Sequence, residues 1–237
     1  LKFDTPYAGG KKILVVGTSK FLLPCKNGKV FNTGHHSTET LVPMYHFDKA
    51  GFQFEFATQD GAPLALEEWT FPMAVGYEDK LHEVRNKIKG QLEAPLKYED
   101  IEEGLDSYAA IFLPGGHGPI IDMHTYESLG KLLRSANAKA ITTISLCHGP
   151  SAFRSAAVGG DFPYKDYKIV VFPDSMDKMS PKFGYLPGYL SEDFLVESKL
   201  KGLGCQVQNK SMDDSISVDR ELVTGASQMS AQKLAEA

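Results

Sequence analysis

The amino-acid sequence predicts a three-layer α/β sandwich, in which a mostly parallel sheet carries helices on both faces. Short apolar runs rich in β-branched residues alternate along the chain with helical patterns, which is typical of strands joined by crossover helices. The chain has 237 residues, of which 42% are hydrophobic and 23% charged. That length and composition suit one generous globular domain with a large buried core.

The first elements of the sandwich are readable from the pattern of apolar residues. Residues 12–17 (KILVVG) predict a buried strand, and a polar loop follows it. A helix is expected from Ser37, a plausible N-cap, to a stop at Gly51, with a bend at Pro43. Residues 52–58 (FQFEFAT) alternate with period 2, so we expect a second strand whose Phe side chains face the core.

Residues 61–100 interrupt this alternation. They contain the only tryptophan, Trp69, and a charged segment from Tyr77 to Leu92. We interpret them as a small helical insertion within a single domain that spans residues 1–237.

The alternation of strands and helices then resumes as far as the end of the chain. Turn residues separate the successive patterns. The expected elements are strand 108–113, helix 124–136, strand 140–146, short helix 151–158, strand 168–172, amphipathic helix 190–203, strand 206–207, a strand or hairpin over 215–224 that turns at Asp219-Arg220, and a last helix from Ser227.

Charge and cysteine content exclude several classes of protein. The 25 Lys and Arg residues against 30 Asp and Glu give a net charge of -5, which argues against nucleic-acid binding through bulk charge. No apolar run approaches the roughly 18–20 residues of a membrane span, and the first residues lack the layout of a signal peptide. Three cysteines without a CxxC pair predict neither a disulfide framework nor a thiolate metal site, and we expect a reducing, cytoplasmic compartment.

Two segments stand where ligands bind in parallel sheets, at the carboxyl ends of strands. The first, residues 113–119 (LPGGHGP), follows a predicted strand. No Gly-Lys-Ser/Thr follows it, so it does not predict a phosphate loop. Gly115 and Gly116 instead allow a close backbone approach and freely aimed N–H groups, which are the ingredients of an oxyanion hole.

The second segment, residues 145–152 (SLCHGPSA), has the strand-turn-helix layout of a nucleophile elbow with a thiol in place of a hydroxyl. Its tight turn is expected to lift Cys147 off the sheet, and the following helix N-terminus to lower the pKa of the thiol. We expect Cys25 and Cys205 to be small buried hydrophobic residues, which is the common role of a lone cysteine. His148 gains significance only from its position beside Cys147.

These segments and three further ones together resemble the ThiJ/PfpI superfamily, in particular its branch of heat-shock holding chaperones that are also glutathione-independent glyoxalases (glyoxalase III) and deglycases. The resemblance runs from about Lys11 to Gly225. It implies a flavodoxin-like fold, similar to that of class I glutamine amidotransferases, and a homodimer. Its motifs are Ser-Thr-Glu-Thr (37–40), Pro-Gly-Gly-His-Gly (114–118), Cys-His-Gly-Pro (147–150), Phe-Pro-Asp-Ser-Met-Asp-Lys (172–178) and Gly-Tyr-Leu-Pro-Gly (184–188).

The resemblance also implies a role for each residue of the predicted site. Asp174 remains a rival to Asp177 as the acid that orients the imidazole, because spacing alone does not separate the two. The implied roles are nucleophile for Cys147, base for His148, orienting acid for Asp177 and an acid against the sulfur for Glu39. The backbone N–H groups of Gly116 and His148 would form the oxyanion hole, Gly115 and Gly116 belong to the loop that binds the substrate, and His117 would contact the substrate oxygen.

A metal site found in some members of this branch is not expected here. It consists of two histidines and one glutamate, whereas the matching positions of this chain hold Asp48 and Gln53. The nearest candidate for a third ligand is His82. Since no pair of imidazoles is evident, we predict neither a zinc ion nor any other cofactor.

The predicted function is conversion of small 2-oxoaldehydes such as methylglyoxal to 2-hydroxy acids through a hemithioacetal on Cys147. Either His148 or Glu39 would carry the proton, and the same site would remove methylglyoxal adducts from amines and thiols. A holding chaperone is the first alternative, in which Trp69 and its apolar neighbours form an exposed patch that binds unfolded proteins. The pattern favours instead a role of these residues in capping the sheet or in a dimer interface. A cysteine amidase or peptidase is the second.

Overall fold

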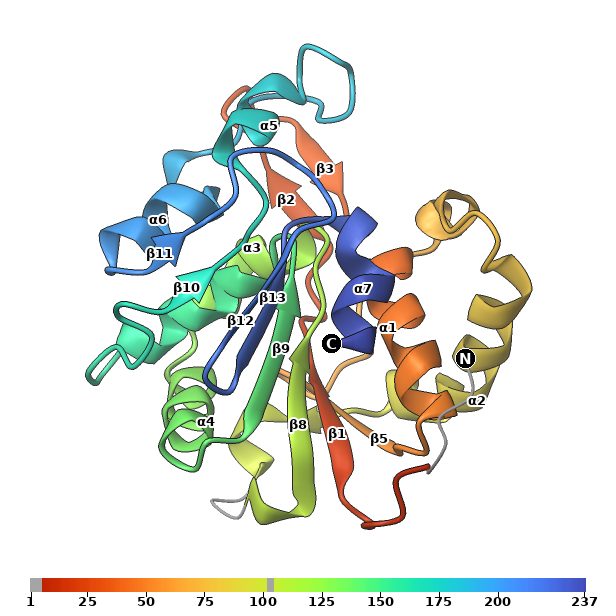
Figure 1. The fold of residues 1–237 in the computed structure, drawn as a ribbon. Helices are drawn as coiled ribbons and strands as arrows, with labels where there is room; N and C mark the ends of the chain where they lie inside the picture. The colour runs from red at the N-terminus through yellow and green to blue at the C-terminus, as the bar shows by residue number, and fades with distance from the viewer. Residues whose placement is uncertain (1–5, 102–104) are drawn as a thin grey trace.

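A seven-stranded sheet with helices on both faces forms the centre of the computed structural model, which describes residues 6–101 and 105–237 (Figure 1). All neighbouring strands in it are parallel except the pair β12 and β13. The predicted fold class is therefore confirmed. From one edge to the other the strands are β12 (Ile216–Asp219), β13 (Leu222–Gly225), β9 (Thr142–Leu146), β8 (Tyr108–Leu113), β1 (Lys12–Val16), β5 (Phe54–Thr58) and β7 (Leu96–Lys97).

The sheet separates two hydrophobic cores because side chains of a strand alternate between its faces. In β1, Leu14 and Val16 belong to one core, and Ile13 and Val15 to the other. The first core is covered by α3 (Gly118–Asp122), the 3₁₀ helices η4 (Met123–Thr125) and η5 (Gly149–Ala157), α4 (Glu127–Ala138) and α6 (Val196–Gly202), the second by α1 (Ser37–Lys49), α2 (Glu78–Glu93) and α7 (Ala231–Glu236).

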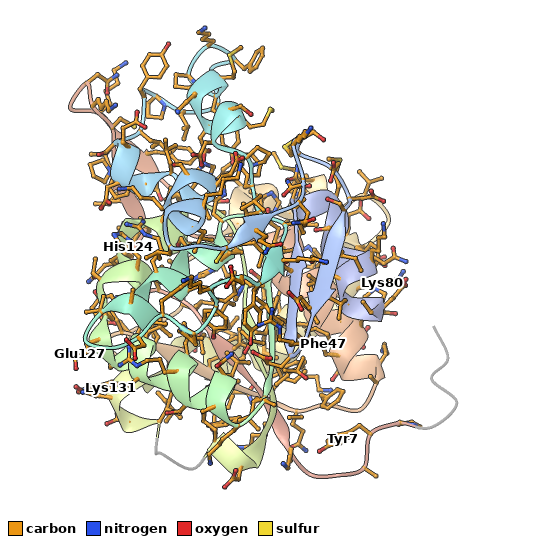
Figure 2. All side chains as sticks on the ribbon, turned by 60° about the vertical axis from the view of Figure 1, so that its left-hand side comes forward. Tyr7, Phe47, Lys80, His124, Glu127 and Lys131 are labelled. Carbon is orange, nitrogen blue, oxygen red and sulfur yellow. The ribbon has the colours of Figure 1, made fainter. Side chains whose placement is uncertain are left out.

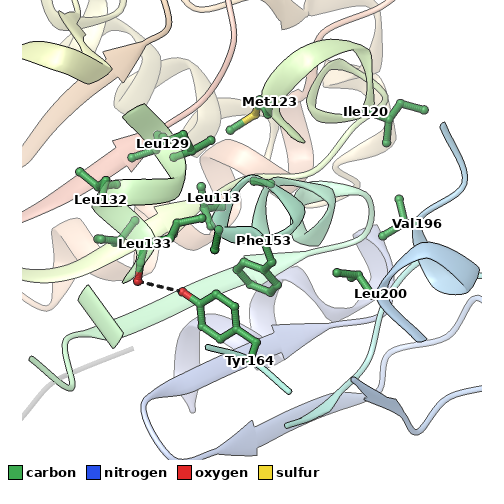
Figure 3. Packing of buried hydrophobic residues seen from close by; sticks show 14 of the residues in the cluster. Leu113, Ile120, Met123, Leu129, Leu132, Leu133, Phe153, Tyr164, Val196 and Leu200 are labelled. Carbon is green, nitrogen blue, oxygen red and sulfur yellow. Dashed lines mark hydrogen bonds between the residues drawn. The ribbon is translucent and has the colours of Figure 1, made fainter. Parts of the chain in front are cut away.

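Helix α4 illustrates how an amphipathic pattern fixes one layer of the sandwich. Its buried face packs Leu133 close to Phe153 and Tyr164, and the Tyr164 hydroxyl donates a hydrogen bond of 3.3 Å to the Leu133 carbonyl (Figure 3). Its outer face carries Glu127 and Lys131, an i,i+4 ion pair of 3.0 Å (Figure 2). Burial of each such large apolar side chain contributes about 1.5–3 kcal/mol.

Residues 61–100 contain β6 (Leu66–Glu67), the 3₁₀ helix η1 (Glu68–Met73), α2, β7 and the 3₁₀ turn η2 (Tyr98–Asp100). Helix α2 buries Leu81, Val84 and Ile88, which recur at helical spacing, and packs on α1. Strand β7 pairs with β5, so this segment also supplies an edge of the sheet. No helix in the described ranges combines the length and apolar character needed to cross a lipid bilayer.

Three expectations about the elements are corrected by the structure. The polar loop after β1 contains a hairpin of β2 (Leu22–Pro24) and β3 (Val30–Asn32), and the helix expected over 190–203 is divided into the 3₁₀ helix η6 (Glu192–Phe194) and α6. The strand expected over 168–172 is short: β10 (Lys168–Ile169) pairs with β11 (Gln206–Val207) outside the main sheet. The amides of the next two residues are bound by the side chains of Thr224 and Asn209, so no ladder continues there.

Candidate active site

Cys147 lies at the sharp turn after β9. Its φ is 59°, in the left-handed region that residues with a side chain seldom adopt. The turn is held because the Cys147 amide donates to the Gly225 carbonyl (2.8 Å) and its carbonyl accepts from the Phe172 amide (3.0 Å). This is the strained strand-to-helix turn of a nucleophile elbow, as the sequence predicts. The element that follows is the 3₁₀ helix η5, not an α-helix.

His148 lies between the thiol and a carboxylate. Its Nδ1 is 3.3 Å from Sγ of Cys147, and its Nε2 is 2.9 Å from Oδ2 of Asp177. An ionised carboxylate only accepts hydrogen bonds, so Nε2 carries the proton and Nδ1 presents its lone pair to the thiol. The ring also stacks on Phe172, with centroids 4.4 Å apart. The imidazole is thus oriented to accept the proton of Cys147.

Asp177 is buried and serves two histidines at once. Its Oδ1 lies 3.2 Å from Nε2 of His117 as well as from Nε2 of His148. Burial opposes ionisation of this carboxyl, but the facing imidazoles of His148 and His117 outweigh it and hold the pKa of Asp177 below its ordinary value. The carboxylate therefore stabilises a positive charge on either ring.

Asp174, the rival acid, is turned away from the imidazoles. Both acids lie on α5 (Asp174–Met179), a short helix that the sequence analysis did not predict. The Asp174 carboxylate accepts hydrogen bonds from the amides of Glu197 (2.9 Å) and Ser198 (3.0 Å) in the first turn of α6. It thus satisfies helix N–H groups that otherwise lack a partner. Of the two acids, the structure brings Asp177 to His148.

The two acids of α5 make a matched pair of variants. We expect Asp177→Asn to lower kcat/KM for the reaction that begins with attack by the Cys147 thiol by about 10²–10⁴-fold, because the imidazolium of His148 loses its counter-charge. We expect Asp174→Asn to leave kcat/KM within about threefold and to lower the free energy of unfolding by about 1 kcal/mol. Steady-state kinetics and urea unfolding of both variants measure these effects. The reverse ranking of the two activities would assign the role to Asp174.

Glu39 approaches the sulfur from the first turn of α1. Its carboxyl lies close to the Cys147 thiol, and its Oε2 accepts the Gly116 amide at 3.0 Å. Burial raises the pKa of Glu39 to about 8. The loop admits no side chain here: a Cβ on Gly115 would lie 1.9 Å from Oε2 of Glu39 and 2.8 Å from Cβ of Cys147. The N–H of Gly116 that the sequence suggests for the oxyanion hole is occupied by Glu39.

The protonation of Cys147 differs from the sequence prediction. The side chain is only 3% exposed, and burial together with the Glu39 carboxyl raises the pKa of the thiol instead of lowering it. The prediction relied on a helix N-terminus and did not weigh the effect of burial and of the Glu39 carboxyl on the pKa of the thiol. A neutral thiol therefore needs to transfer its proton during attack, and His148 is placed to receive it.

Two adjacent histidines that the sequence analysis did not select help to build the site. His36 caps α1, its Nδ1 accepting the Thr38 amide at 3.2 Å, and burial lowers its pKa to about 4. His35 accepts the Thr18 amide at 2.9 Å, and its Nδ1 lies 3.1 Å from the Gly115 carbonyl. It thereby links the end of β1 to the glycine loop. Their tandem position before the helix containing Glu39 was the available signal.

Side chains of the candidate site line a cavity of about 260 Å³, which reaches the thiol of Cys147. Its lining includes polar residues of the predicted site as well as several apolar side chains that the sequence analysis did not select. The lining residues are His36, Glu39, Met73, Gly116, His117, Cys147, His148, Phe172, Met176, Ser180, Phe183, Tyr185, Met212 and Gln228.

Asp48 and His82, which the sequence analysis considered as metal ligands, make other contacts in the structure. Asp48 forms an ion pair with Lys87, and His82 stacks on Phe71 with centroids 5.1 Å apart. In the described ranges, one group of side chains has ligand atoms within 4.8 Å of one another, namely His117, His148 and Asp177. Those atoms already make the hydrogen bonds between Asp177 and the two imidazoles.

Comparison with known proteins relates this chain to a family. A model described as "ThiJ/PfpI family-like" matches residues 30–185. A protein/nucleic acid deglycase of Pseudomonas aeruginosa is 40% identical over 98% of this chain and 81% of its own length. The protein of the same name from Escherichia coli O157:H7 is 39% identical over the same shares.

Solved structures of more distant proteins share the fold. Glyoxalase III of Candida albicans superposes with a TM-score of 0.74 at 23% identity, over 95% of each chain. DJ-1beta of Drosophila melanogaster gives a TM-score of 0.56 at 17% identity, over 95% of this chain and 87% of that one.

Proposed function

Because the chain belongs to the ThiJ/PfpI-like family, we propose that it converts 2-oxoaldehydes such as methylglyoxal to 2-hydroxy acids without glutathione, and that it also removes their adducts from amines and thiols. The observation that carries this proposal is the pair of acid–base groups on the thiol: the imidazole of His148 on one side and the buried carboxyl of Glu39 on the other. A group with a pKa near 8 is efficient at taking up and returning a proton near neutral pH.

The first step is attack of Cys147 on the aldehyde carbon. The C–S bond forms as the thiol proton passes to Nδ1 of His148, and the imidazolium is stabilised by Asp177. The carbonyl oxygen then takes this proton from the His148 imidazolium, which gives a hemithioacetal. His117 lines the cavity beside His148 and is placed to contact a substrate oxygen.

The second step moves hydrogen between the two carbons. The Glu39 carboxylate takes the proton from the former aldehyde carbon, which gives an enediolate, and returns it to the neighbouring carbon, while the hydroxyl proton of the first carbon passes to the oxygen of the second. The first carbon is thereby oxidised to a thioester and the second reduced to an alcohol. Water then cleaves the thioester, which releases the 2-hydroxy acid and restores the thiol. The balance needs no external oxidant or reductant.

The same site accounts for deglycase activity, the activity named for the relatives. In an early adduct the aldehyde carbon carries a hydroxyl and an amine. Cys147 displaces the amine, which leaves with a proton from His148, and the hemithioacetal that results follows the path above. Release of free amine and lactate from a methylglyoxal–lysine adduct, compared with lactate formation from methylglyoxal alone, tests both activities of the purified protein.

A holding chaperone remains a second candidate, because apolar side chains are exposed in residues 61–100. Trp69 is 47%, Met73 52% and Val75 85% exposed. Such a patch can bind unfolded chains. We expect this activity to survive Cys147→Ala and to fall in Val75→Ser, as measured by light scattering of an aggregating client protein. Loss of suppression in Cys147→Ala alone would contradict an independent chaperone function.

An amidase or peptidase is the third candidate, since thiol, imidazole and carboxylate are the parts that acyl transfer requires. It gives no role to a buried acid on the sulfur, so Glu39 favours the glyoxalase.

We further propose that the protein acts as a homodimer in the cytoplasm, where its three free cysteines stay reduced. Assembly is measurable by light scattering after size-exclusion chromatography.

A further inference from the structure

We propose that the cavity selects neutral 2-oxoaldehydes that carry an apolar group larger than methyl, aryl groups above all, and rejects those with an anionic tail. This substrate class rests on the proposed function, because it concerns the outer part of the same cavity. It does not concern the groups that react.

The outer wall of the cavity is apolar and partly exposed. Phe183, in the loop after α5, is 72% exposed, and Met73, at the end of η1, is 52% exposed. Met212 and Met176 contribute further apolar surface. Apolar side chains at the mouth of a cavity lose contact with water only when something covers them, so a ligand with an apolar tail gains the free energy of that burial.

One part of this wall is held firmly in place. Tyr185 packs against Phe31 and Trp69, with ring centroids 5.6 and 6.0 Å apart, and its ring is 5.7 Å from that of His117. A fixed aromatic surface beside the reacting groups suits a planar tail, since aromatic pairs gain free energy beyond burial alone. The methyl group of methylglyoxal is too small to cover Tyr185 and Phe183 together.

The charges around the cavity also favour a neutral substrate over an anionic one. Among the lining residues of the described chain there is no Lys or Arg, and the polar side chains outside the reacting cluster are His36, Ser180, Tyr185 and Gln228. The floor holds the acid Glu39, and Asp177 lies behind the imidazoles. A carboxylate or phosphate at the mouth of the cavity would lose its hydration without gaining a Lys or Arg partner.

The test compares three probes: methylglyoxal, phenylglyoxal and 4-carboxyphenylglyoxal, the last having nearly the shape of phenylglyoxal with an added negative charge. One buried methylene changes binding by roughly fourfold, so we expect kcat/KM for phenylglyoxal to exceed that for methylglyoxal by at least about tenfold. We expect 4-carboxyphenylglyoxal to fall at least about tenfold below phenylglyoxal.

Variants separate recognition by the wall from the intrinsic reactivity of each aldehyde. Phe183→Ser and Met73→Ser should lower the ratio of kcat/KM for phenylglyoxal to kcat/KM for methylglyoxal about tenfold. Phe21→Ser is the matched control, because Phe21 is 50% exposed and does not line the cavity. It should change neither value, and thermal unfolding of all three variants verifies that they fold.

The outcomes distinguish failure of the substrate class from failure of the function. If Cys147-dependent turnover of methylglyoxal is present but the phenylglyoxal ratio is unchanged in Phe183→Ser and Met73→Ser, the substrate class is wrong and the function stands. Equal turnover of the carboxylated probe overturns the charge argument. Absence of turnover of every probe, or turnover that survives Cys147→Ala, overturns both.

Discussion

Replacement of Cys147 by alanine is expected to reduce lactate formation from methylglyoxal by at least about a thousandfold. Without the sulfur no hemithioacetal forms, and neither His148 nor Glu39 has a covalent intermediate on which to act. Loss of one member of a group that works as a unit costs nearly the whole rate enhancement. Enzymatic quantification of lactate, with methylglyoxal at saturation and no glutathione present, measures the effect.

The other two cysteines provide the controls. Cys25 and Cys205 are buried, 7% and 5% exposed, and neither lines the cavity. Cys25→Ala and Cys205→Ala should retain activity within about threefold, with a modest loss of stability from the small voids they leave. If Cys147→Ala keeps more than about a tenth of the activity, methylglyoxal is converted elsewhere and the proposed function is wrong.

The alternation of strands and helices was predictable because it depends on local patterns. Strand β8 has the predicted bounds, and the hairpin turning at Asp219-Arg220 is present. Residues 170–172 were harder, since an apolar extended run looks the same whether its amides bond to a strand or to side chains. There Thr224 and Asn209, distant in sequence, bind the amides of Val170 and Val171. Only the tertiary structure reveals that choice.

The candidate site likewise has features that the sequence predicts and features that depend on the tertiary structure. The contact between Cys147 and His148 follows from adjacent residues at a tight turn, so the sequence contained it. The choice of Asp177 over Asp174 depends on where α6 presents its free amides, which no spacing encodes. The pKa of the thiol depends on burial by several separate segments. The prediction considered only the turn, and its direction was therefore wrong.

Glu39→Gln is expected to lower kcat by about 10²–10⁴-fold while leaving alkylation of Cys147 by iodoacetamide measurable. A glutamine amide can still donate a hydrogen bond to the sulfur, but it cannot carry a proton between two carbons of the substrate. The pair of readouts thus separates proton transfer from activation of the thiol. Rapid-quench turnover and mass spectrometry of the alkylated protein measure them.

The pH dependence of the same variant tests the direction of the proton transfer. Because the step needs the carboxylate of Glu39, kcat of the unaltered enzyme should rise as pH increases through about 8, the value to which burial raises its pKa. Since that pKa is above its ordinary value, the protonated carboxyl stabilises the fold at low pH, and this stability is lost as pH rises from about 4.5 through about 8. Glu39→Gln should lack both dependences and be the more stable protein at pH 9.

Asp122→Asn is the control for removing a carboxyl with a raised pKa, because Asp122 binds Thr18 and Tyr126 and does not line the cavity. It should leave kcat and its pH profile unchanged. If Glu39→Gln retains kcat within about tenfold and the same rise near pH 8, the proton is moved by the other base on the sulfur. His148 is then the shuttle, and Glu39 acts on the thiol alone.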